Sequence, residues 1–301
     1  MKFKKITLTL CFSLLIALLL TYPSESVSFA KDGLLTWFNT MLPTLMPFMI
    51  LSTLMISLHL TDFLGAPAYC IIMGFLCGFP MGAKVVKDLY QKNALTLNQA
   101  NDLLGFCNNL GPIFILNFAL PTLGVHNRHW CVLGFYGIPL IYGLILRNLH
   151  RNEYLNSTVE LPKAQLYNTK LLYHIDDAIQ CAISSITILG GYMIFFNLLN
   201  IIPYAISQLN SLILTLPYFD LLLPQIRCFI EISGGLASLQ SFSPFALCLI
   251  PLGGLSCLAQ TYSILKETDL SFTLYCRHKI IQTAFTCLYF IILTFCGISF
   301  Y

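Results

Sequence analysis

Long apolar runs with few charges among them are the feature that most constrains this sequence. Of its 301 residues, 57% are hydrophobic and 10% are charged, whereas soluble domains carry about 25% charged residues. The mean hydropathy is +0.76, which excludes a water-soluble fold and a disordered chain. The sequence therefore predicts an all-α polytopic membrane protein.

The N-terminal segment, residues 1–30, is expected to contain a transmembrane helix. Three lysines (Lys2, Lys4 and Lys5) precede an apolar run over residues 6–20. A signal peptide is the alternative interpretation, because Ser28-Phe29-Ala30 resembles a small-x-small cleavage site. Ordinary spans are predicted at residues 34–60, 130–146, 171–199 and 272–297.

Two short apolar segments are predicted to form re-entrant hairpins. Residues 66–77 provide twelve apolar positions, but crossing a hydrocarbon core of about 30 Å takes about 20. This limb ends at a tip, residues 78–82, and a charged limb follows it. Residues 221–232 form a similar limb that ends at a second tip, residues 233–235. Residues 201–217 are apolar but interrupted by prolines, and their placement stays open.

Two longer runs are predicted to be broken transmembrane helices. Residues 97–120 are interrupted at residues 108–112, and residues 244–265 are interrupted at residues 251–254. Proline lacks an amide hydrogen and disfavours helix at the preceding residue. Each half therefore has the order span, hairpin, broken helix, span. The sequence predicts a first repeat over residues 31–146, a cytoplasmic linker over 147–170 and a second, inverted repeat over 171–301.

Charge placement predicts a cytoplasmic N-terminus. With the hairpins returning to the side they start from, twelve of the 16 Lys and Arg residues fall on the cytoplasmic side, as the positive-inside rule requires. Lys279 is counted among these twelve. The twelve cysteines form no CxxC pair, so neither a metal site nor disulfides are expected, and no cofactor or nucleic-acid partner is indicated.

Four interruptions at similar depth predict a shared polar cavity, because irregular backbone within a membrane needs protein or water to satisfy it. Glu231, just before the second tip, needs a partner or a proton at that depth. Arg227 lies four residues earlier on the same helix face, and Lys84 follows the first tip. We predict an ion pair among Lys84, Arg227 and Glu231. A ligand or proton site, or an interfacial position of Glu231, is the alternative.

The remaining candidates for substrate or ion binding surround the same interruptions. The amides of Asn108, Asn109 and Gln260 can donate and accept hydrogen bonds to a ligand, or they can cap the broken backbone. The full candidate set is Gly78, Phe79, Pro80, Gly82, Lys84, Asn108, Asn109, Gly111, Glu231, Ser233, Gly234, Gly235, Gly253, Gly254 and Gln260. The sequence contains no motif of a catalytic site, so an enzyme is not expected.

These motifs together resemble a known family. They are Gly78-Phe79-Pro80-Met81-Gly82-Ala83-Lys84, Phe106-Cys107-Asn108-Asn109-Leu110-Gly111-Pro112, Glu231-Ile232-Ser233-Gly234-Gly235, and Gly253-Gly254-Leu255 with Gln260. In this order they resemble the YlbJ-type sporulation integral membrane proteins of the nucleoside-recognition Gate domain group. The resemblance implies a protein of spore-forming bacteria that acts in spore formation, in cortex assembly, and distant kinship with concentrative nucleoside transporters. It does not imply a nucleoside substrate.

The expected function is therefore that of a transporter or permease-like protein of unknown substrate. It would lie in the bacterial cell membrane, in the mother-cell or forespore membrane during sporulation. Its expected partners are membrane lipid, an unidentified small molecule or ion, and further copies of the chain. A non-transporting scaffold that recruits sporulation partners through residues 147–170 is the alternative.

Overall fold

The computed structural model describes residues 2–58, 64–150, 171–209, 219–239 and 242–300. All regular structure within these ranges is helical, and seven helical segments are long and apolar enough to cross a membrane. The prediction of an all-α polytopic membrane protein is therefore confirmed. The seven segments are Lys4–Thr21, Pro23–Ser57, Leu97–Thr122, Arg128–Leu149, Leu171–Leu209, Pro244–Leu265 and Phe272–Phe295.

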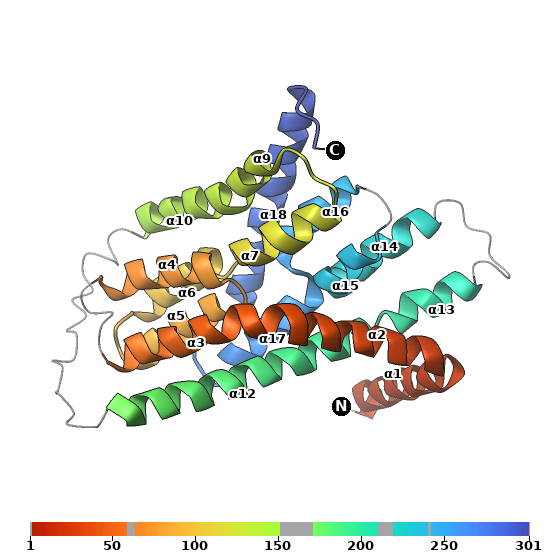
Figure 1. The fold of residues 1–301 in the computed structure, drawn as a ribbon, viewed down its shortest axis with the longest axis horizontal. Coiled ribbons are helices and arrows are strands. Elements are labelled where there is room, and N and C mark those ends of the chain that lie inside the picture. Colours follow the sequence, from red (N-terminus) through yellow and green to blue (C-terminus); the bar gives the residue numbers. More distant parts are fainter. Residues whose placement is uncertain (1, 59–63, 151–170, 210–218, 240–241, 301) are drawn as a thin grey trace.

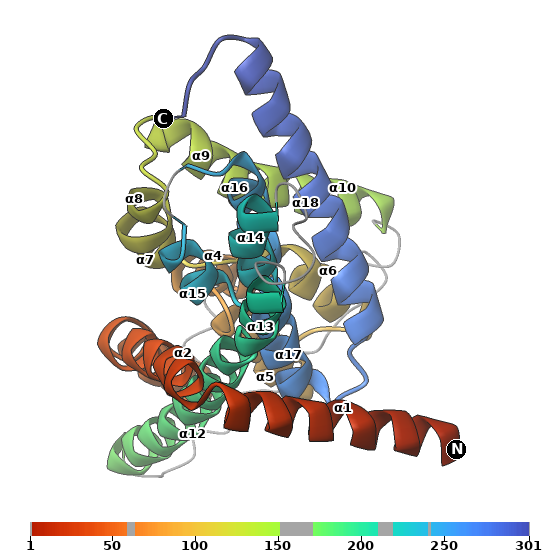
Figure 2. The ribbon, with the colours of Figure 1, turned by 90° about the vertical axis from the view of Figure 1, so that its right-hand side faces the viewer.

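The first helix stands apart from the rest of the molecule. In α1 (Lys2–Thr21), no residue of the candidate span is buried inside the structure. Figure 2 shows α1 extending sideways from the helices that carry the core. We therefore expect the apolar side chains of α1 to contact lipid, because their exposure to water would be unfavourable.

The second helix begins earlier than its apolar pattern predicts. α2 (Pro23–Thr36), a π-helical turn η1 (Trp37–Met41) and α3 (Leu42–Ser57) form one continuous helical segment. Proline at the first helical position starts this helix at residue 23, where its missing amide hydrogen has no cost. Residues 23–33 are polar, and the apolar pattern starts only after them.

A proline follows each of the three π-helical turns among the described residues. These turns are η1, η3 (Ile115–Ala119) and η4 (Leu133–Gly137), and Pro43, Pro121 and Pro139 follow two residues after each turn. Proline has no amide hydrogen to donate to the carbonyl oxygen of residue i−4, and the proline ring collides with that carbonyl group. A widened turn before the proline relieves that collision, so the helix continues.

Two long helical segments lie side by side in the fold. α12 (Leu171–Leu198) runs along α2 and α3 (Figure 1). The indole Nε1 of Trp37 donates to the Ile186 carbonyl oxygen over 2.8 Å. After α12 the short helix α13 (Ile201–Leu209) covers the first part of residues 201–217, and the rest of that segment lies outside the described residues.

The elements that follow α3 form the first hairpin, the first interrupted helix and the next span. Thr96 and Gln99 form a capping box at the start of α6, which fixes the N-terminus of that helix. The helix ends at residue 107 and resumes at the proline of residue 112. The elements are α4 (Ala66–Cys77), α5 (Met81–Gln91), α6 (Leu97–Cys107), α7 (Pro112–Phe114), η3, α8 (Leu120–Thr122), α9 (Arg128–Val132), η4 and α10 (Ile138–Leu149).

The elements after α13 include a second hairpin, whose return limb is shorter than that of the first. The last helix crosses α12 at a steep angle in Figure 1. The inverted orientation of the halves, the re-entrant placement of the hairpins and the domain boundaries stay predictions, and linker residues 151–170 lie outside the described residues. The elements are α14 (Phe219–Ile230), α15 (Ile232–Ala237), α16 (Pro244–Leu249), the 3₁₀ turn η6 (Ile250–Leu252), α17 (Gly254–Leu265) and α18 (Phe272–Phe295).

Candidate functional site

The first hairpin tip is bonded directly to the first helix interruption. The amide of Phe79 donates to the carbonyl oxygen of Asn109 over 2.6 Å, and the amide of Ala83 donates to Asn108 Oδ1 over 3.1 Å. Gly78 has a φ of +78°, and a Cβ there would collide with the backbone of Gly111. The tip and the interruption therefore satisfy each other's exposed backbone groups.

Glycines allow this close approach. An ideal Cβ on Gly82 would lie 2.8 Å from the Cα of Asn108, and one on Gly111 would lie 2.8 Å from the carbonyl oxygen of Cys77. Real Cβ atoms do not come so close to backbone. These two glycines therefore allow the contact because they have no side chain. Pro80, at the same tip, precedes the first turn of α5.

Asn108 connects the first interruption to two helices of the second half. Its side-chain nitrogen donates to Thr261 Oγ1 over 3.0 Å and to the Tyr275 hydroxyl over 3.1 Å. Thr261 lies on α17 and Tyr275 on α18. Because its Oδ1 also accepts from the amide of Ala83, the side-chain amide of Asn108 uses both its donor and its acceptor capacity.

Lys279 is a site residue that the sequence analysis misplaced. It was counted as a cytoplasmic surface charge, but it is 0% exposed, and its Nζ donates to Asn109 Oδ1 over 2.6 Å. The same Nζ lies 5.2 Å from the ring centroid of Phe79 and 6.0 Å from that of Tyr275, within the range of cation–π contact. Its place inside the predicted span 272–297 was the signal, because charges within spans mark functional sites.

The second tip is capped by its own carboxylate. Glu231 is 3% exposed and accepts from Ser233 Oγ over 2.6 Å, from the amide of Gly234 over 2.7 Å and from Asn197 Nδ2 over 3.0 Å. Gly235 approaches the backbone of Cys228 so closely that a Cβ would collide with it. Asn197, on α12, was not predicted as a site residue, because nothing in its local sequence distinguishes it.

The predicted ion pair among Lys84, Arg227 and Glu231 is not formed within the described part of the chain. Lys84 Nζ lies 2.7 Å from Asp88 Oδ2, four residues further along α5. The guanidinium of Arg227 lies 5.2 Å from the ring centroid of Phe29. Glu231 has neutral donors instead of a cation. A local i,i+4 partner was available to Lys84, which makes a long-range pair unnecessary.

The second interruption contacts the first tip and the end of the limb that precedes the second tip. Gly253 and Gly254 have φ values of +73° and +75°, a conformation that favours glycine. An ideal Cβ on Gly253 would lie 3.2 Å from Cε2 of Phe79, and one on Gly254 would lie 3.0 Å from the carbonyl oxygen of Phe229. Both interruptions, the first tip and the end of the limb before the second tip therefore meet in one buried region, which we call the central junction.

A polar pocket of about 340 Å³ lies beside the central junction. It is lined by Pro80 and Lys84 of the first hairpin and by Gln260 of α17, whose Nε2 donates to Ser256 Oγ over 3.0 Å. Charged and hydroxyl side chains form much of its wall. They include Lys87, Asp88, Ser184, Ser185, Tyr192, Ser263, Lys266 and Glu267.

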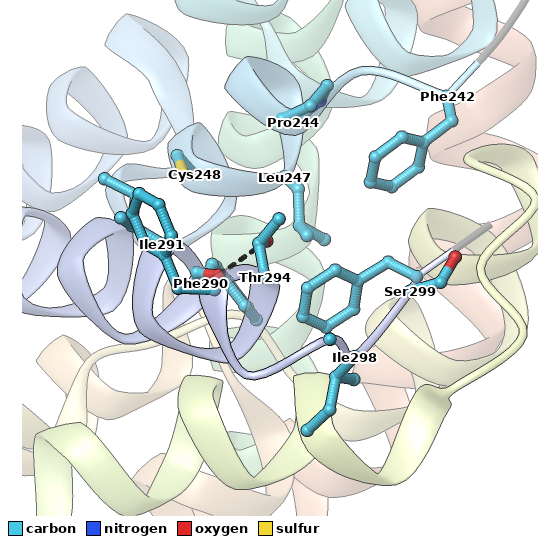
Figure 3. Close-up of a pocket in the computed structure, with 12 residues that line it drawn as sticks. Phe242, Pro244, Leu247, Cys248, Phe290, Ile291, Thr294, Ile298 and Ser299 are labelled. Carbon is cyan, nitrogen blue, oxygen red and sulfur yellow. Dashed lines mark hydrogen bonds between the residues drawn. The ribbon is translucent and has the colours of Figure 1, made fainter.

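A larger cavity of about 530 Å³ lies elsewhere, between α16, the end of α18 and the C-terminal residues (Figure 3). Phe242, Leu247 and Ile298 are among its apolar lining. The Thr294 hydroxyl donates to the carbonyl oxygen of Phe290 and is therefore occupied. None of the predicted site residues lines this cavity, so it is not the candidate site. Within the described ranges no group of three or more His, Cys, Asp or Glu could hold a metal ion.

The fold and the central junction define a multi-pass helical membrane protein with buried polar groups at interrupted helices. The chain is 25% identical to the sporulation integral membrane protein YlbJ of Bacillus subtilis (strain 168), over 94% of this chain and 81% of that protein. This similarity confirms the resemblance to YlbJ-type proteins; the Gate domain assignment stays a prediction. No family model matches the chain, and no solved structure matches it.

Proposed function

We propose that this protein is a membrane transporter for a small polar solute and that it acts in spore formation. The observation that carries the proposal is the polar pocket, which reaches the tip of the first hairpin at Pro80 and ends beside the central junction. Interrupted helices that meet at a polar site are typical of secondary transporters. The similarity to YlbJ, a sporulation integral membrane protein, supports the role in sporulation, and cortex assembly is the process that we propose it serves.

The central junction supplies what alternating access requires. Phe79 lies over Lys279 and against Gly253, so its ring covers this lysine, and the next residue, Pro80, lines the polar pocket. Displacement of the first tip would expose Lys279 and would break the hydrogen bonds that join the first hairpin to Asn108 and Asn109. With the predicted cytoplasmic N-terminus, the polar pocket opens toward the cytoplasm, and the buried side would open outward.

Two native cysteines provide a direct test. Cys181 lines the polar pocket, whereas Cys257 is buried beside Gly253. Vesicles of both orientations that contain the full chain would be treated with a charged methanethiosulfonate reagent, and each cysteine would be followed by peptide mass spectrometry. Transport predicts fast labelling of Cys181 from the cytoplasmic side and slower labelling of Cys257 from both sides.

The control variants sharpen this experiment. Phe79→Ala removes the ring over Lys279 and should speed the labelling of Cys257 from the cytoplasmic side by about tenfold, since roughly 1.4 kcal/mol of occlusion corresponds to that factor. Cys257→Ser should remove the signal. Absence of Cys257 labelling from either side, in the native chain and in Phe79→Ala, would contradict a transport path.

The scaffold alternative makes the opposite prediction in cells. A scaffold that recruits partners through residues 147–170 needs this linker, so a deletion within residues 151–170 should stop spore formation while Lys279→Met and Glu231→Gln leave it intact. A transporter needs the central junction, so both substitutions should reduce the yield of heat-resistant spores while the protein still reaches the membrane.

A further inference from the structure

A second cluster of titratable side chains lies where α6, α10 and α18 meet. Asp102 of α6 is 3% exposed, and its Oδ2 lies 2.8 Å from Nδ1 of His150, the residue that ends α10. The side chain of His150 is 41% exposed. A buried carboxylate therefore has a partner that is open to water.

His278 of α18 lies deeper in the same cluster. It is buried, and its Nδ1 lies 2.7 Å from the hydroxyl of Tyr142 on α10. The charged groups that act on it are Asp102 from α6, His150 from the end of α10, and Arg277 and Lys279 from α18 itself. The protonation of each group therefore affects that of the others, because a charge on one changes the free energy of charging the others.

Backbone contact holds α18 against α6 at this point. An ideal Cβ on Gly105 would lie 2.7 Å from Cδ2 of His278, so only glycine leaves room for the ring. Gln282, one turn further along α18, donates from Nε2 to the carbonyl oxygen of Gly105 over 2.7 Å. Because Gly105 lies three residues after Asp102 on α6, both contacts are one turn from the carboxylate.

Two buried polar atoms of this cluster have no hydrogen-bond partner among the residues that the structure describes. They are Nε2 of His278 and Oε1 of Gln282, and both side chains are more than nine-tenths buried. Buried polar atoms are almost always paired. A protonated His278 offers a donor at Nε2 and Gln282 offers an acceptor, so the two atoms match a bound water that carries or relays a proton.

The cluster is also next to the central junction. His278 precedes Lys279, whose Nζ bonds to Asn109 of the first interruption. A positive charge on His278 makes a positive charge on Lys279 less favourable, and low-dielectric surroundings strengthen this effect. Protonation of His278 therefore affects the hydrogen bond between Lys279 and Asn109 of the first interruption.

We infer that Asp102, His150 and His278, with Tyr142 and Gln282, form a proton-binding site. A proton from water binds at His150, is shared with Asp102 and is stored on His278; it leaves by the same path, so one proton is bound and no other bond changes. The bound proton weakens the contact between Lys279 and Asn109 and favours displacement of the first tip. That last step rests on the proposed transport function, whereas proton binding does not.

Nuclear magnetic resonance of the full chain in lipid nanodiscs, with ¹⁵N-labelled histidine, tests proton binding directly. The ring nitrogen shifts of His278, assigned with His278→Gln, should change reversibly between about pH 8 and 5, the range in which histidine charges. Asp102→Asn removes the neighbouring negative charge and should lower the protonated fraction of His278 near pH ~6 by about threefold or more. Asp176→Asn, an exposed position on α12, is the control and should leave the fraction unchanged.

His150→Gln is a second variant at a half-exposed position, which should fold, and it should also alter the titration of His278. A His278 signal that does not change over this pH range, or that titrates identically in all four proteins, would overturn the proton site. Coupling is read from Cys257 labelling relative to Cys181, which should rise at low pH in the native chain and stay flat in Asp102→Asn. Titration without any Cys257 labelling would leave the proton site standing and remove the transport function.

Discussion

The two hairpin tips satisfy their backbone with partners of different origin. At the first tip, the partners are Asn108 and Asn109 of the interrupted helix, and these residues are in turn bonded to α17 and α18. At the second tip, the carboxylate of Glu231 bonds to Ser233 and Gly234 of its own segment. A single side-chain bond, from Asn197, reaches it from α12.

This difference indicates that the first tip is held more firmly than the second, so the proposed displacement of the first tip needs a trigger such as the bound proton. Displacing the first tip separates it from the interruption, and several hydrogen bonds are lost together. The second tip takes Ser233 and Gly234 with it, so displacement breaks only the bond between Glu231 and Asn197 among those described for the carboxylate. Elements with few external bonds open at low free-energy cost.

The largest expected effect tests the fit at the first tip. Gly78→Ala places a Cβ on a residue with positive φ, against the backbone of Gly111. Strain and displacement together should lower the free energy of unfolding by about 3 kcal/mol or more. Thermal unfolding of the purified full chain in detergent measures it.

Gly191→Ala is the matched control, because no atom lies within 4 Å of a Cβ at that position. It should leave the unfolding temperature nearly unchanged. Equal behaviour of the two alanine variants would show that the tip is not held closely against the interruption.

The next effect concerns the buried cation. Asn109→Leu removes the oxygen that accepts from Lys279, and leaving a buried charge without its partner costs about 3 kcal/mol. The double variant with Lys279→Met should recover most of that stability, because no charge then needs a partner. Additive losses in this double-mutant cycle would contradict the importance of the contact.

The smallest effect is expected at the second tip. Glu231→Gln keeps the shape and an oxygen that accepts from the amide of Gly234 and from Asn197, but it loses the acceptor for Ser233. We expect a loss of about 1–2 kcal/mol, measured by the same unfolding assay, with the exposed Asp269→Asn as control. A loss as large as that of Gly78→Ala would mean that the second tip is held as firmly as the first.

Sequence reasoning predicts the parts of this molecule that depend on local chemistry. Apolar length defines the spans, and the structure interrupts the helices at the prolines and glycines of residues 108–112 and 251–254. Asn108, Asn109 and Gly78 meet as neighbours in space because backbone left open at one interruption needs partners from another.

The choice of partners could not be predicted in the same way. Lys84 pairs with Asp88 on its own helix, and Glu231 uses neutral donors, so the long-range ion pair was replaced by closer groups. Lys279 and Asn197 lie in apolar helical runs, where the inward face is set by helix packing. Identifying them requires knowing which helices touch.

The π-helical turns before Pro43, Pro121 and Pro139 affect how easily the helices of each half bend. Widened turns lack regular i→i−4 bonding, so bending concentrates there. Within the described ranges all three belong to the first half, whereas α12 and α18 run through 28 and 24 residues as regular helix. Long helices of the first half thus contain joints, whereas α12 and α18 of the second half are uninterrupted, so we expect bending to occur mainly in the first half.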